Sequence, residues 1–418
     1  MSQQAKGGVL YVTYDGLLEP LGQSQVLAYL EKLAPQWPIH VLSFEKPKDI
    51  DDGPRMDAMR QRLAKTGIGW TPLRYHKSPT IPATGFDILQ GACCALWLGL
   101  RRKVAIVHAR SYVAALIALP VKRLLGAKLL FDIRGFWADE RVDGGLWPKD
   151  GGLYRAVKKL EGAFVASADH MVTLTHSSVR ELQKWPAFAK LQPPLSVIPT
   201  CADLERFSPG PAPAREPLVF GYVGSLGTWY LFDETIEFFL ALRRRRPDAK
   251  MLVVNRNEHE PARQAFARHG IEADHFEIVA VEHFEVPRQI ARMHTAGAVI
   301  KPSYSKISSA PTKLAEYLGC GVPCVGNVGV GDMEEVLEGR RVGVALRDFS
   351  PADIESAADR LLALLEEPAL RHRCSAVAHE LFSLDIGVAR YRSIYGELSD
   401  AMGSTQASDV SNEGKGSR

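Results

Sequence analysis

The sequence is poor in the features that mark several common classes of protein. It has six cysteines in 418 residues, and none stands in a Cys-x-x-Cys pair or at a spacing typical of zinc ligands. Scattered cysteines of this kind indicate reduced thiols in the core of a cytoplasmic protein. The formal net charge is only +3, which argues against nucleic acid as the main partner.

Targeting segments, dinucleotide motifs and metal motifs are missing as well. Residues 1–6 are polar and lack a signal-peptide pattern, and the longest uncharged apolar stretch, 88–100, is too short to span a bilayer. The first strand-loop-helix segment lacks Gly-x-Gly-x-x-Gly, so no dinucleotide cofactor is indicated. Asp49 and Asp51 form an Asp-x-Asp in a polar loop rather than at a strand end, so we expect no metal site there.

The chain alternates between short apolar runs and amphipathic segments over most of its length. The runs predict strands, and the segments between them predict helices. This order favours parallel sheets covered on both faces, the doubly wound α/β class. A proline-containing passage around 199–213 divides the pattern into two parts, as the length also predicts. The expected strands are 8–13, 39–44, 70–75, 104–108, 128–131, 170–174 and 195–198 in the first part, and 218–223, 250–254, 276–281, 298–300, 322–325 and 342–346 in the second.

One stretch, 308–325, organises the second part of the chain. Pro311 suits the first turn of a helix, Leu314 belongs to its apolar face, and two glycines end it before the next strand. The free N–H groups at the start of such a helix attract an anion, most often phosphate. Glu316 leans back toward the helix start, where a carboxylate suits ribose hydroxyls rather than phosphate. An ordinary αβ unit with a solvated Glu316 is the alternative.

Residues 316–323, Glu-Tyr-Leu-Gly-Cys-Gly-Val-Pro, resemble the second half of a motif in the retaining GT-B glycosyltransferases of family four. That motif consists of a Glu, seven residues, a second Glu and a helix that ends in a Cys-Gly-x-Pro-like turn. The first Glu contacts the donor sugar in the family, and here it is replaced by Ser308. Residues 203–209, Asp-Leu-Glu-Arg-Phe-Ser-Pro, are similar to the family's interdomain linker.

The resemblance implies two Rossmann-like domains that face a cleft, with the donor in the second. We expect an acceptor-binding domain at 1–205, a nucleotide-sugar-binding domain at 206–382, a helix at 383–400 that crosses back to the first domain, and a disordered tail at 401–418. Relatives often carry an Arg and a Lys after the first glycine of 224–229; neither is present here, and two lysines further along can substitute. The predicted donor-binding residues are Gly22, Gly224, Ser225, Asn255, Arg256, Val286, Lys301, Ser308, Pro311, Thr312, Lys313, Leu314 and Glu316.

A second group of candidates follows strands of the first domain. Arg134 stands where relatives usually place a catalytic-site His, and it can act only through charge and hydrogen bonds because it stays protonated. His108 matches a His that follows an earlier strand in many relatives. The predicted catalytic residues are Arg134, His108, Asp139 and Glu140, beside a stacking platform of Phe136 and Trp137. Alternatively, His108 packs at a strand end, and a structural ion-pair network joins Asp132, Arg134, Asp139 and Arg141.

The resemblance implies a retaining, metal-independent glycosyltransferase. It would move a hexose-type sugar from a nucleoside diphosphate sugar to a glycan or lipid-linked glycan acceptor, as in the synthesis of a surface polysaccharide. Basic residues at 101–103, 122–123 and 128 lie beside apolar residues, including Trp97 and Leu124, which suits contact with the inner face of an anionic membrane. Helices packed on the sheet with solvated ends are the alternative reading of that pattern.

Two other functions remain open from the sequence. The first is a non-catalytic nucleotide-sugar-binding partner, because the first Glu, the His and the Arg/Lys pair of the family are replaced. The second is a sugar-nucleotide epimerase of the GT-B fold, whose sugar would be surrounded by Asp139, Glu140, His108 and His176.

Overall fold

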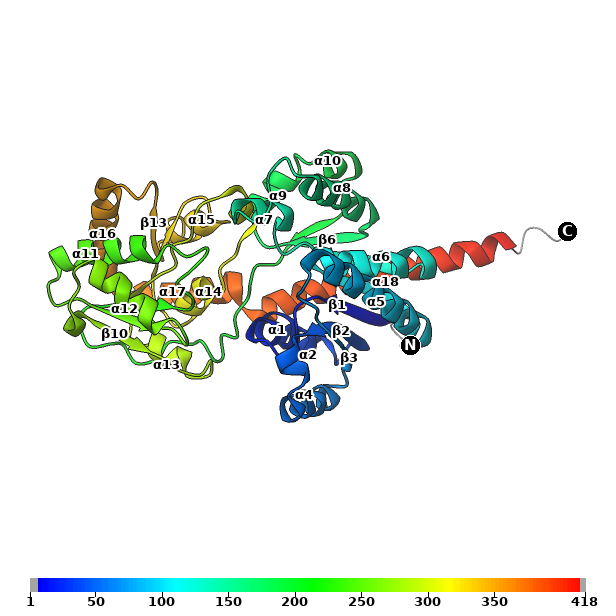
Figure 1. Ribbon diagram of the computed structural model, residues 1–418, viewed down its shortest axis with the longest axis horizontal. Coiled ribbons are helices and arrows are strands. Elements are labelled where there is room, and N and C mark those ends of the chain that lie inside the picture. The colour runs from blue at the N-terminus through cyan, green and yellow to red at the C-terminus, as the bar shows by residue number, and fades with distance from the viewer. Residues whose placement is uncertain (1–6, 414–418) are drawn as a thin grey trace.

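The computed structural model describes residues 7–413, which form two α/β domains side by side (Figure 1). The first sheet has seven strands in the order β3-β2-β1-β4-β5-β6-β7, and the second has six in the order β10-β9-β8-β11-β12-β13. The strands pair in parallel throughout both sheets. In each sheet the order reverses beside the domain's first strand, which confirms the predicted doubly wound class.

The first domain is built from short αβ units. Its strands are β1 (Gly8–Thr13), β2 (Ile39–Glu45), β3 (Gly69–Arg74), β4 (Val104–Arg110), β5 (Lys128–Asp132), β6 (His170–Thr173) and β7 (Leu195–Val197). Its helices are α1 (Pro20–Gly22), η1 (Gln23–Leu27), α2 (Ala28–Leu33), α3 (Pro47–Ile50), α4 (Gly53–Thr66), α5 (Thr80–Arg102), α6 (Ser111–Leu125), α7 (Trp137–Asp143), α8 (Gly152–Ser167), α9 (His176–Leu182) and α10 (Pro186–Leu191).

The second domain repeats the alternation. Its strands are β8 (Val219–Val223), β9 (Lys250–Val254), β10 (Phe276–Val279), β11 (Thr295–Gly297), β12 (Cys324–Asn327) and β13 (Gly343–Leu346). The helices are α11 (Phe232–Arg245), α12 (His259–Arg268), η2 (Ala273–His275), α13 (Val286–Ile290), η3 (Tyr304–Ser308), α14 (Thr312–Gly319), α15 (Met333–Leu337), α16 (Pro351–Leu365) and α17 (Leu370–Phe382), followed by α18 (Leu384–Glu413).

Helices cover both faces of each sheet, so the central strands are mostly apolar, with polar residues toward their carboxyl ends. In the first domain, side chains of α5, α6 and α8 pack with one face of the sheet, and those of α2, α4 and α18 pack with the other. Helix α18 therefore completes the first domain although it follows the second in sequence, as the expected crossing helix does. Figure 1 shows it running from the second domain along the first.

The two chain crossings between the domains lie side by side. Ala202, on the way out of the first domain, and Ser383, on the way back, form a short parallel bridge. The Ala202 N–H donates to Phe382 O at 2.9 Å, and the Leu384 N–H donates to Ala202 O at 3.1 Å. Within residues 7–413 these two segments are the only covalent connections between the domains. Because the bridge pairs them, they form a single pivot about which one domain can rotate against the other.

Three elements differ from the sequence-based expectation. The strand expected at 298–300 lies three residues earlier, at β11 (Thr295–Gly297). The Ala298 N–H nevertheless continues the pairing and donates to Val325 O at 2.7 Å. Helix α18 continues to Glu413 instead of ending near 400, and 414–418 of the expected disordered tail lie outside the described residues. Helix α5 begins at Thr80, and it is the one described helix long and apolar enough to cross a membrane by length and composition.

Candidate active site

The start of α14 lies beside the turn that follows β8. Pro311 precedes the helix with extended backbone, and Thr312 begins it. Gly224 ends β8 with φ +103°, a conformation that side chains rarely adopt, and a Cβ placed there would lie 3.6 Å from Lys313 Nζ. The structure thus brings together two of the predicted donor-binding segments, which are almost 90 residues apart in the sequence.

Lys313 is the most unusual charged group at this place. Its side chain is buried between the rings of Tyr230 and Tyr222, with Nζ 3.6 and 4.4 Å from their centroids. Within the described residues Nζ has no hydrogen-bond partner. Burial lowers the pKa of this ammonium to about 7. A buried cation without an anion is costly, and an anion that binds at the start of α14 would supply the missing partner.

Glu316 lies further along the same helix and is only partly covered, with 13% of its side chain exposed. Its carboxylate is 4.0 Å from His283 Nε2. His283 belongs to the loop before α13, where the buried Val286, one of the predicted donor-binding residues, begins the helix. Glu316, which is predicted to bind ribose, and this loop are therefore neighbours, as expected if both contact one nucleoside.

Several other predicted donor residues have clear structural partners. Asn255 Nδ2 donates to Gly224 O at 2.9 Å and so fixes the turn after β8 rather than facing solvent. Arg256 is exposed and forms an ion pair with Glu282 at 2.6 Å. Gly22 is buried, and a Cβ there would lie 1.9 Å from Gly16 O, so this glycine is required by the packing of the loop after β1.

Ser225 and Lys301 are exposed at the ends of β8 and of the segment after β11, and Leu314 is buried in the core. The backbone of Lys301 is fixed, because its N–H donates to Trp229 O at 2.8 Å. The surroundings of these three side chains neither support nor contradict the predicted contact with a donor, which stays a prediction.

Ser308 lies where the two domains touch. Its hydroxyl accepts a hydrogen bond from the Phe136 N–H at 3.0 Å and donates to Ser305 O at 2.8 Å, and the side chain is fully buried. A neighbouring contact joins Lys306 to Glu140 at 2.9 Å, with the ammonium 3.8 Å from the centroid of the Trp229 ring. The position of the family's sugar-binding Glu is thus occupied by a contact between domains.

Arg134 sits in a tight turn at the carboxyl end of β5. The Gly135 N–H donates to Ile133 O at 2.7 Å, and Arg134 between them has φ +54°. Such a three-residue turn is strained for a residue other than glycine. The guanidinium is 3.8 Å from Asp132, and 11% of the side chain is exposed. Although burial acts to lower the pKa of Arg134, the Asp132 carboxylate raises it, so the residue is a fixed cation.

His108 lies behind this turn and is buried. Its Nδ1 is 2.8 Å from the Tyr395 hydroxyl of α18, and its Nε2 is 3.8 Å from Asp132. Tyr391 of α18 donates to Asp132 at 2.9 Å. Burial lowers the pKa of His108, so the ring is neutral. Its contacts are those of a strand-end packing residue, the alternative reading of the sequence.

Asp139 and Glu140 are adjacent on α7 but have separate neighbours. Asp139 accepts hydrogen bonds from Tyr154 at 2.7 Å and from Lys158 at 3.0 Å, whereas Glu140 pairs with Lys306. Of the alternative ion-pair network of Asp132, Arg134, Asp139 and Arg141, the Asp132–Arg134 pair is present. The rest is wrong, because Asp139 pairs with Lys158, and the Arg141 guanidinium lies over the Trp137 ring at 5.2 Å. The expected platform is also wrong at Phe136, which is buried under Tyr304 and Trp185.

Comparison with protein families identifies the family of this chain. A model of glycosyl transferases group 1 matches residues 205–380, and a model of a glycosyl transferase 4-like domain matches residues 23–194. This chain belongs to the GT-B glycosyltransferases of the family-four type. A comparison with curated protein sequences gave no match.

Solved structures show that the transferase shares its fold with distant proteins. Sucrose-phosphate synthase from Thermosynechococcus elongatus matches with TM-score 0.71 at 14% identity, over 95% of this chain and 100% of that one. The Anabaena protein HepE, solved with UDP and glucose, matches with TM-score 0.63 at 14% identity, over 93% and 99%. The lipopolysaccharide outer core galactosyltransferase WaaB matches with TM-score 0.62 at 11% identity, over 93% and 99%.

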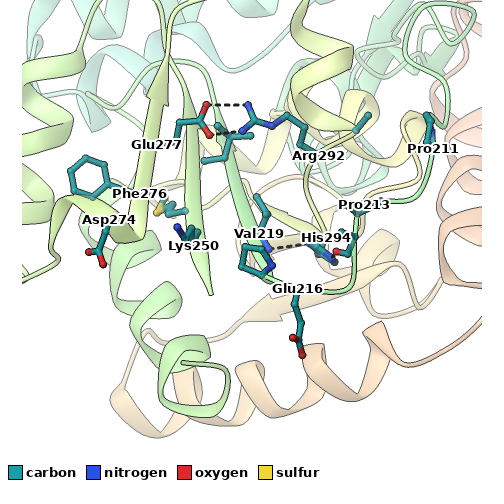
Figure 2. Close-up of a pocket in the computed structure, with 15 residues that line it drawn as sticks. Pro211, Pro213, Glu216, Val219, Lys250, Asp274, Phe276, Glu277, Arg292 and His294 are labelled. Atoms are coloured by element: carbon teal, nitrogen blue, oxygen red, sulfur yellow. Dashed lines mark hydrogen bonds and ion pairs between the residues drawn. The ribbon is translucent and has the colours of Figure 1, made fainter. Parts of the chain in front are cut away.

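Two further features of the second domain lie at the opposite edge of its sheet. A hollow of about 560 Å³ opens at the amino ends of β8, β9 and β10, where Figure 2 shows the Glu277–Arg292 pair on one side and His294 bonded to Val219 on the other. Of the described residues, Glu272, Asp274 and His275 form the one group that could hold a metal ion, and Asp274 lines this hollow. Ligands of doubly wound sheets bind at the carboxyl ends, so neither feature belongs to the donor site of the transferase.

Sequence reasoning missed the surroundings of Lys313. Tyr222 reads as an ordinary apolar strand residue and Tyr230 as part of a loop, so nothing local marks them as the two walls of a lysine pocket. Lys306 was also missed, although it links η3 to α7. The sequence does contain one indication for Tyr230, because it lies in the loop after β8 where relatives carry an Arg and a Lys and this chain carries neither.

Proposed function

We propose that the transferase moves a hexose-type sugar from a nucleoside diphosphate sugar to a glycan or lipid-linked glycan, with retention of anomeric configuration, in the synthesis of a surface polysaccharide. The observation that carries the proposal is Lys313, a buried cation without a partner among the described residues, beside the start of α14 and the open backbone of Gly224. Glu316 and His283 continue the site in the direction that a nucleoside would take.

The chemistry follows from charge. A leaving nucleoside diphosphate gains negative charge as the bond to the sugar breaks. The N–H groups at the start of α14 and the Lys313 ammonium are fixed there before the reaction, which is the arrangement that stabilises developing charge best. We infer that these groups act without a divalent metal. The diphosphate oxygens can then accept the proton of the acceptor hydroxyl, as the resemblance to retaining enzymes implies.

Uridine diphosphate is the first donor nucleotide to test, because the similar HepE was solved with UDP and with UDP-glucose. Melting temperatures should be measured with UDP, GDP and their sugars. We expect the ligands of one base, uracil or guanine, to raise the melting temperature and those of the other to leave it unchanged. At a hundredfold its dissociation constant, a ligand adds about 2.7 kcal/mol to stability. Transfer to an acceptor should then persist in excess EDTA.

Glu316→Gln is the variant that tests the site. The amide keeps the size of the side chain but loses the charge that accepts ribose hydroxyls. We expect weaker nucleotide binding and an unchanged melting temperature of the free protein, because the nearest ion-pair partner of Glu316 in the described part of the chain is His283, at 4.0 Å. Intact nucleotide affinity with a large loss of stability would assign Glu316 to the fold.

A binding protein without transfer activity is the second candidate, and the contact of Ser308 with Phe136 favours it. That contact occupies the position where the family binds the donor sugar. A protein of this kind would gain stability with a nucleotide but form no product with any acceptor. The epimerase is not favoured, since Asp139, Glu140 and His108 have separate neighbours and do not surround one space.

We further propose that the first domain contacts an anionic membrane through α5. The helix buries one face on the sheet, through residues that include Asp87 and Gly91, and leaves a row of apolar side chains more than half exposed on the other. The basic residues Arg101, Arg102, Lys103 and Arg123 are exposed beside it. The row consists of Ile81, Phe86, Leu89, Trp97 and Leu100, with Leu124 of α6.

This combination suits a membrane surface better than water. A wide exposed apolar row on a soluble protein marks an interaction site, and flanking cations favour anionic lipid. Lys122 and Lys128 do not join the surface, because both pair with Asp169. A lipid-linked acceptor would be presented at the same surface, which is why this contact belongs with the proposed reaction.

A further inference from the structure

A second hollow, of about 600 Å³, lies in the first domain between α7, α8 and the start of α10. Tyr304 of η3 closes it from the second domain. The hollow is separate from the site around Lys313 and Glu316, and α7 connects it instead to the contact between the domains. Asp139 lines the hollow, and the next residue, Glu140, bonds to Lys306 beside Ser308. No residue of the proposed donor site lines this space.

Aromatic rings form its walls. Tyr304 is 39% exposed and Trp185 is half-buried, and each packs against the buried Phe136, with centroids 5.6 and 5.4 Å apart. Phe136 holds both rings in place, so neither pays a large entropy cost when a ligand packs on it. The apolar C–H face of a pyranose ring packs on such a ring, while its hydroxyl rim needs polar groups beside the ring.

The polar groups of the hollow are balanced in charge. Lys158 lies between Asp139 at 3.0 Å and Glu161 at 2.5 Å, with its ammonium 4.4 Å from the centroid of the Trp185 ring. The Tyr154 hydroxyl donates to Asp139 at 2.7 Å. Because the carboxylates already hold the lysine, the hollow has hydrogen-bonding edges without a strong field of one sign. The exposed Lys149 and Lys159 also line it, and together with Lys158 they face three carboxylates, those of Asp139, Asp143 and Glu161. The hollow therefore carries no net charge, which suits a neutral polyol.

Small residues keep the hollow open. Gly162 is in the middle of α8 with ordinary helical backbone, and a Cβ there would meet only Ala187 Cβ, at 3.7 Å. Glycine at such a position weakens a helix relative to alanine, and here neither backbone strain nor a clash requires it. Its effect is to leave space in the wall of the hollow.

We propose that this hollow is a subsite for a neutral oligosaccharide, which holds the glycan part of the acceptor away from the reaction site. The identification of the ligand as part of the acceptor rests on the proposed function, whereas the binding of a neutral oligosaccharide does not depend on it. We infer that a glycan whose reacting end lies between the domains extends past α7 to the hollow, because Asp139 lines the hollow and the adjacent Glu140 contacts Lys306 of the second domain.

Two matched pairs of variants test the subsite. Gly162→Phe fills the hollow, and Gly162→Ala adds one methyl group in ordinary contact. Tyr304→Ala removes a wall, and Tyr304→Phe keeps the ring and loses only the hydroxyl bonded to Glu181. Binding is measured by saturation-transfer NMR and calorimetry with maltohexaose, cellohexaose and isomaltohexaose, with hexagalacturonate as the charged comparison, and UDP binding is measured on each protein.

We expect at least one neutral hexasaccharide to bind the unmutated protein. Gly162→Phe and Tyr304→Ala should weaken it about tenfold or more, while both controls stay within about twofold. UDP affinity should be equal in the unmutated protein and the four variants. A protein that binds no UDP would contradict the proposed function, and that result is distinguishable from a loss of oligosaccharide binding. Three results overturn the proposal: no neutral hexasaccharide binds, only hexagalacturonate binds, or the filled and wall-less variants bind as the unmutated protein does.

Discussion

At the scale of single residues, Lys313 links nucleotide binding to pH. Burial between Tyr222 and Tyr230 lowers its pKa to about 7, and the other titratable groups that face it are Glu316 on its own helix and Cys324 of β12. A bound diphosphate favours the ammonium and raises that pKa. Above pH 7, binding therefore takes up a proton, and we expect affinity for UDP to fall by up to about tenfold per pH unit between pH 7 and 9.

The variants of Lys313 separate this linkage from simple charge loss. Lys313→Arg stays protonated, so its affinity for UDP should be nearly independent of pH. Lys313→Met should bind weakly at every pH. In the free protein the unfolded chain holds this proton up to about pH 10 and the folded chain loses it near 7, so stability relative to Lys313→Met should rise with pH across that window. Calorimetric titration and melting curves measure both effects, and an affinity that does not change from pH 7 to 9 contradicts the proposal.

Arg134 is the residue whose role the sequence leaves most open. Its strained turn and its contact with Asp132 direct a fixed cation to the carboxyl edge of the first sheet. If that cation stabilises the leaving diphosphate, Arg134→Ala should lower turnover by about a hundredfold to a thousandfold. Arg134→Lys keeps a charge near Asp132 and should retain the melting temperature while losing most of the rate. Near-normal turnover in a folded Arg134→Ala protein would return the residue to a structural role.

At the scale of elements, α5 carries the prediction for the membrane. The double variant Trp97→Glu/Leu100→Glu places charge in the exposed apolar row without touching the face packed on the sheet. The unmutated protein should float with anionic vesicles at low salt and less so at high salt, because the basic residues contribute through screened attraction. The double variant should stay at the bottom of the gradient. Leu191→Glu, on the exposed side of α10, is the control and should float like the unmutated protein.

The same helix shows what the sequence reveals about elements and what it does not. Apolar runs predict the strands to within a few residues, because parallel strands buried on both faces admit little else. The start of α5 was not predicted, since Asp87 interrupts the apolar run. In the structure Asp87 is buried and accepts hydrogen bonds from Tyr14 and from the His76 backbone, at 2.7 and 3.1 Å, so it belongs to the inner face of the helix.

The candidate site divides in the same way. Pro311, Lys313 and Glu316 are local to one strand-helix unit, so their place in the first turns of one helix could be predicted from order alone. The pairing of His108 with Tyr395 joins residues 287 positions apart, and that of Asp139 with Lys158 depends on how two helices pack. Single-sequence patterns hold no information on such contacts, which is why the alternative ion-pair network is present only at Asp132 and Arg134.

At the scale of the whole molecule, the domains are joined at the pivot and by a group of contacts on the side of α7 and α9, which includes Ser308 with Phe136 and Lys306 with Glu140. The pivot at Ala202 and Ser383 holds both chain crossings together. On the side of α7 and α9, Asp332 of the second domain accepts hydrogen bonds from the N–H groups of His176 and Ser177, at 2.6 and 2.8 Å. A carboxylate at the start of a helix is favourably placed, and this one joins the domains. It is therefore a latch that opposes rotation about the pivot.

Breaking this latch should open the cleft without unfolding either domain. In Asp332→Ala the two N–H groups of α9 lose their acceptor, at a cost of about 1 kcal/mol. We expect a larger radius of gyration by small-angle scattering, an unchanged affinity for UDP, whose proposed site lies within the second domain, and a lower turnover, because transfer needs groups from both domains. Glu335→Ala is the matched control: its pair with Arg180 also crosses between the domains, but both side chains are more than half exposed, so it should contribute little. Equal scattering curves for the two variants would show that Asp332 does not hold the domains closed.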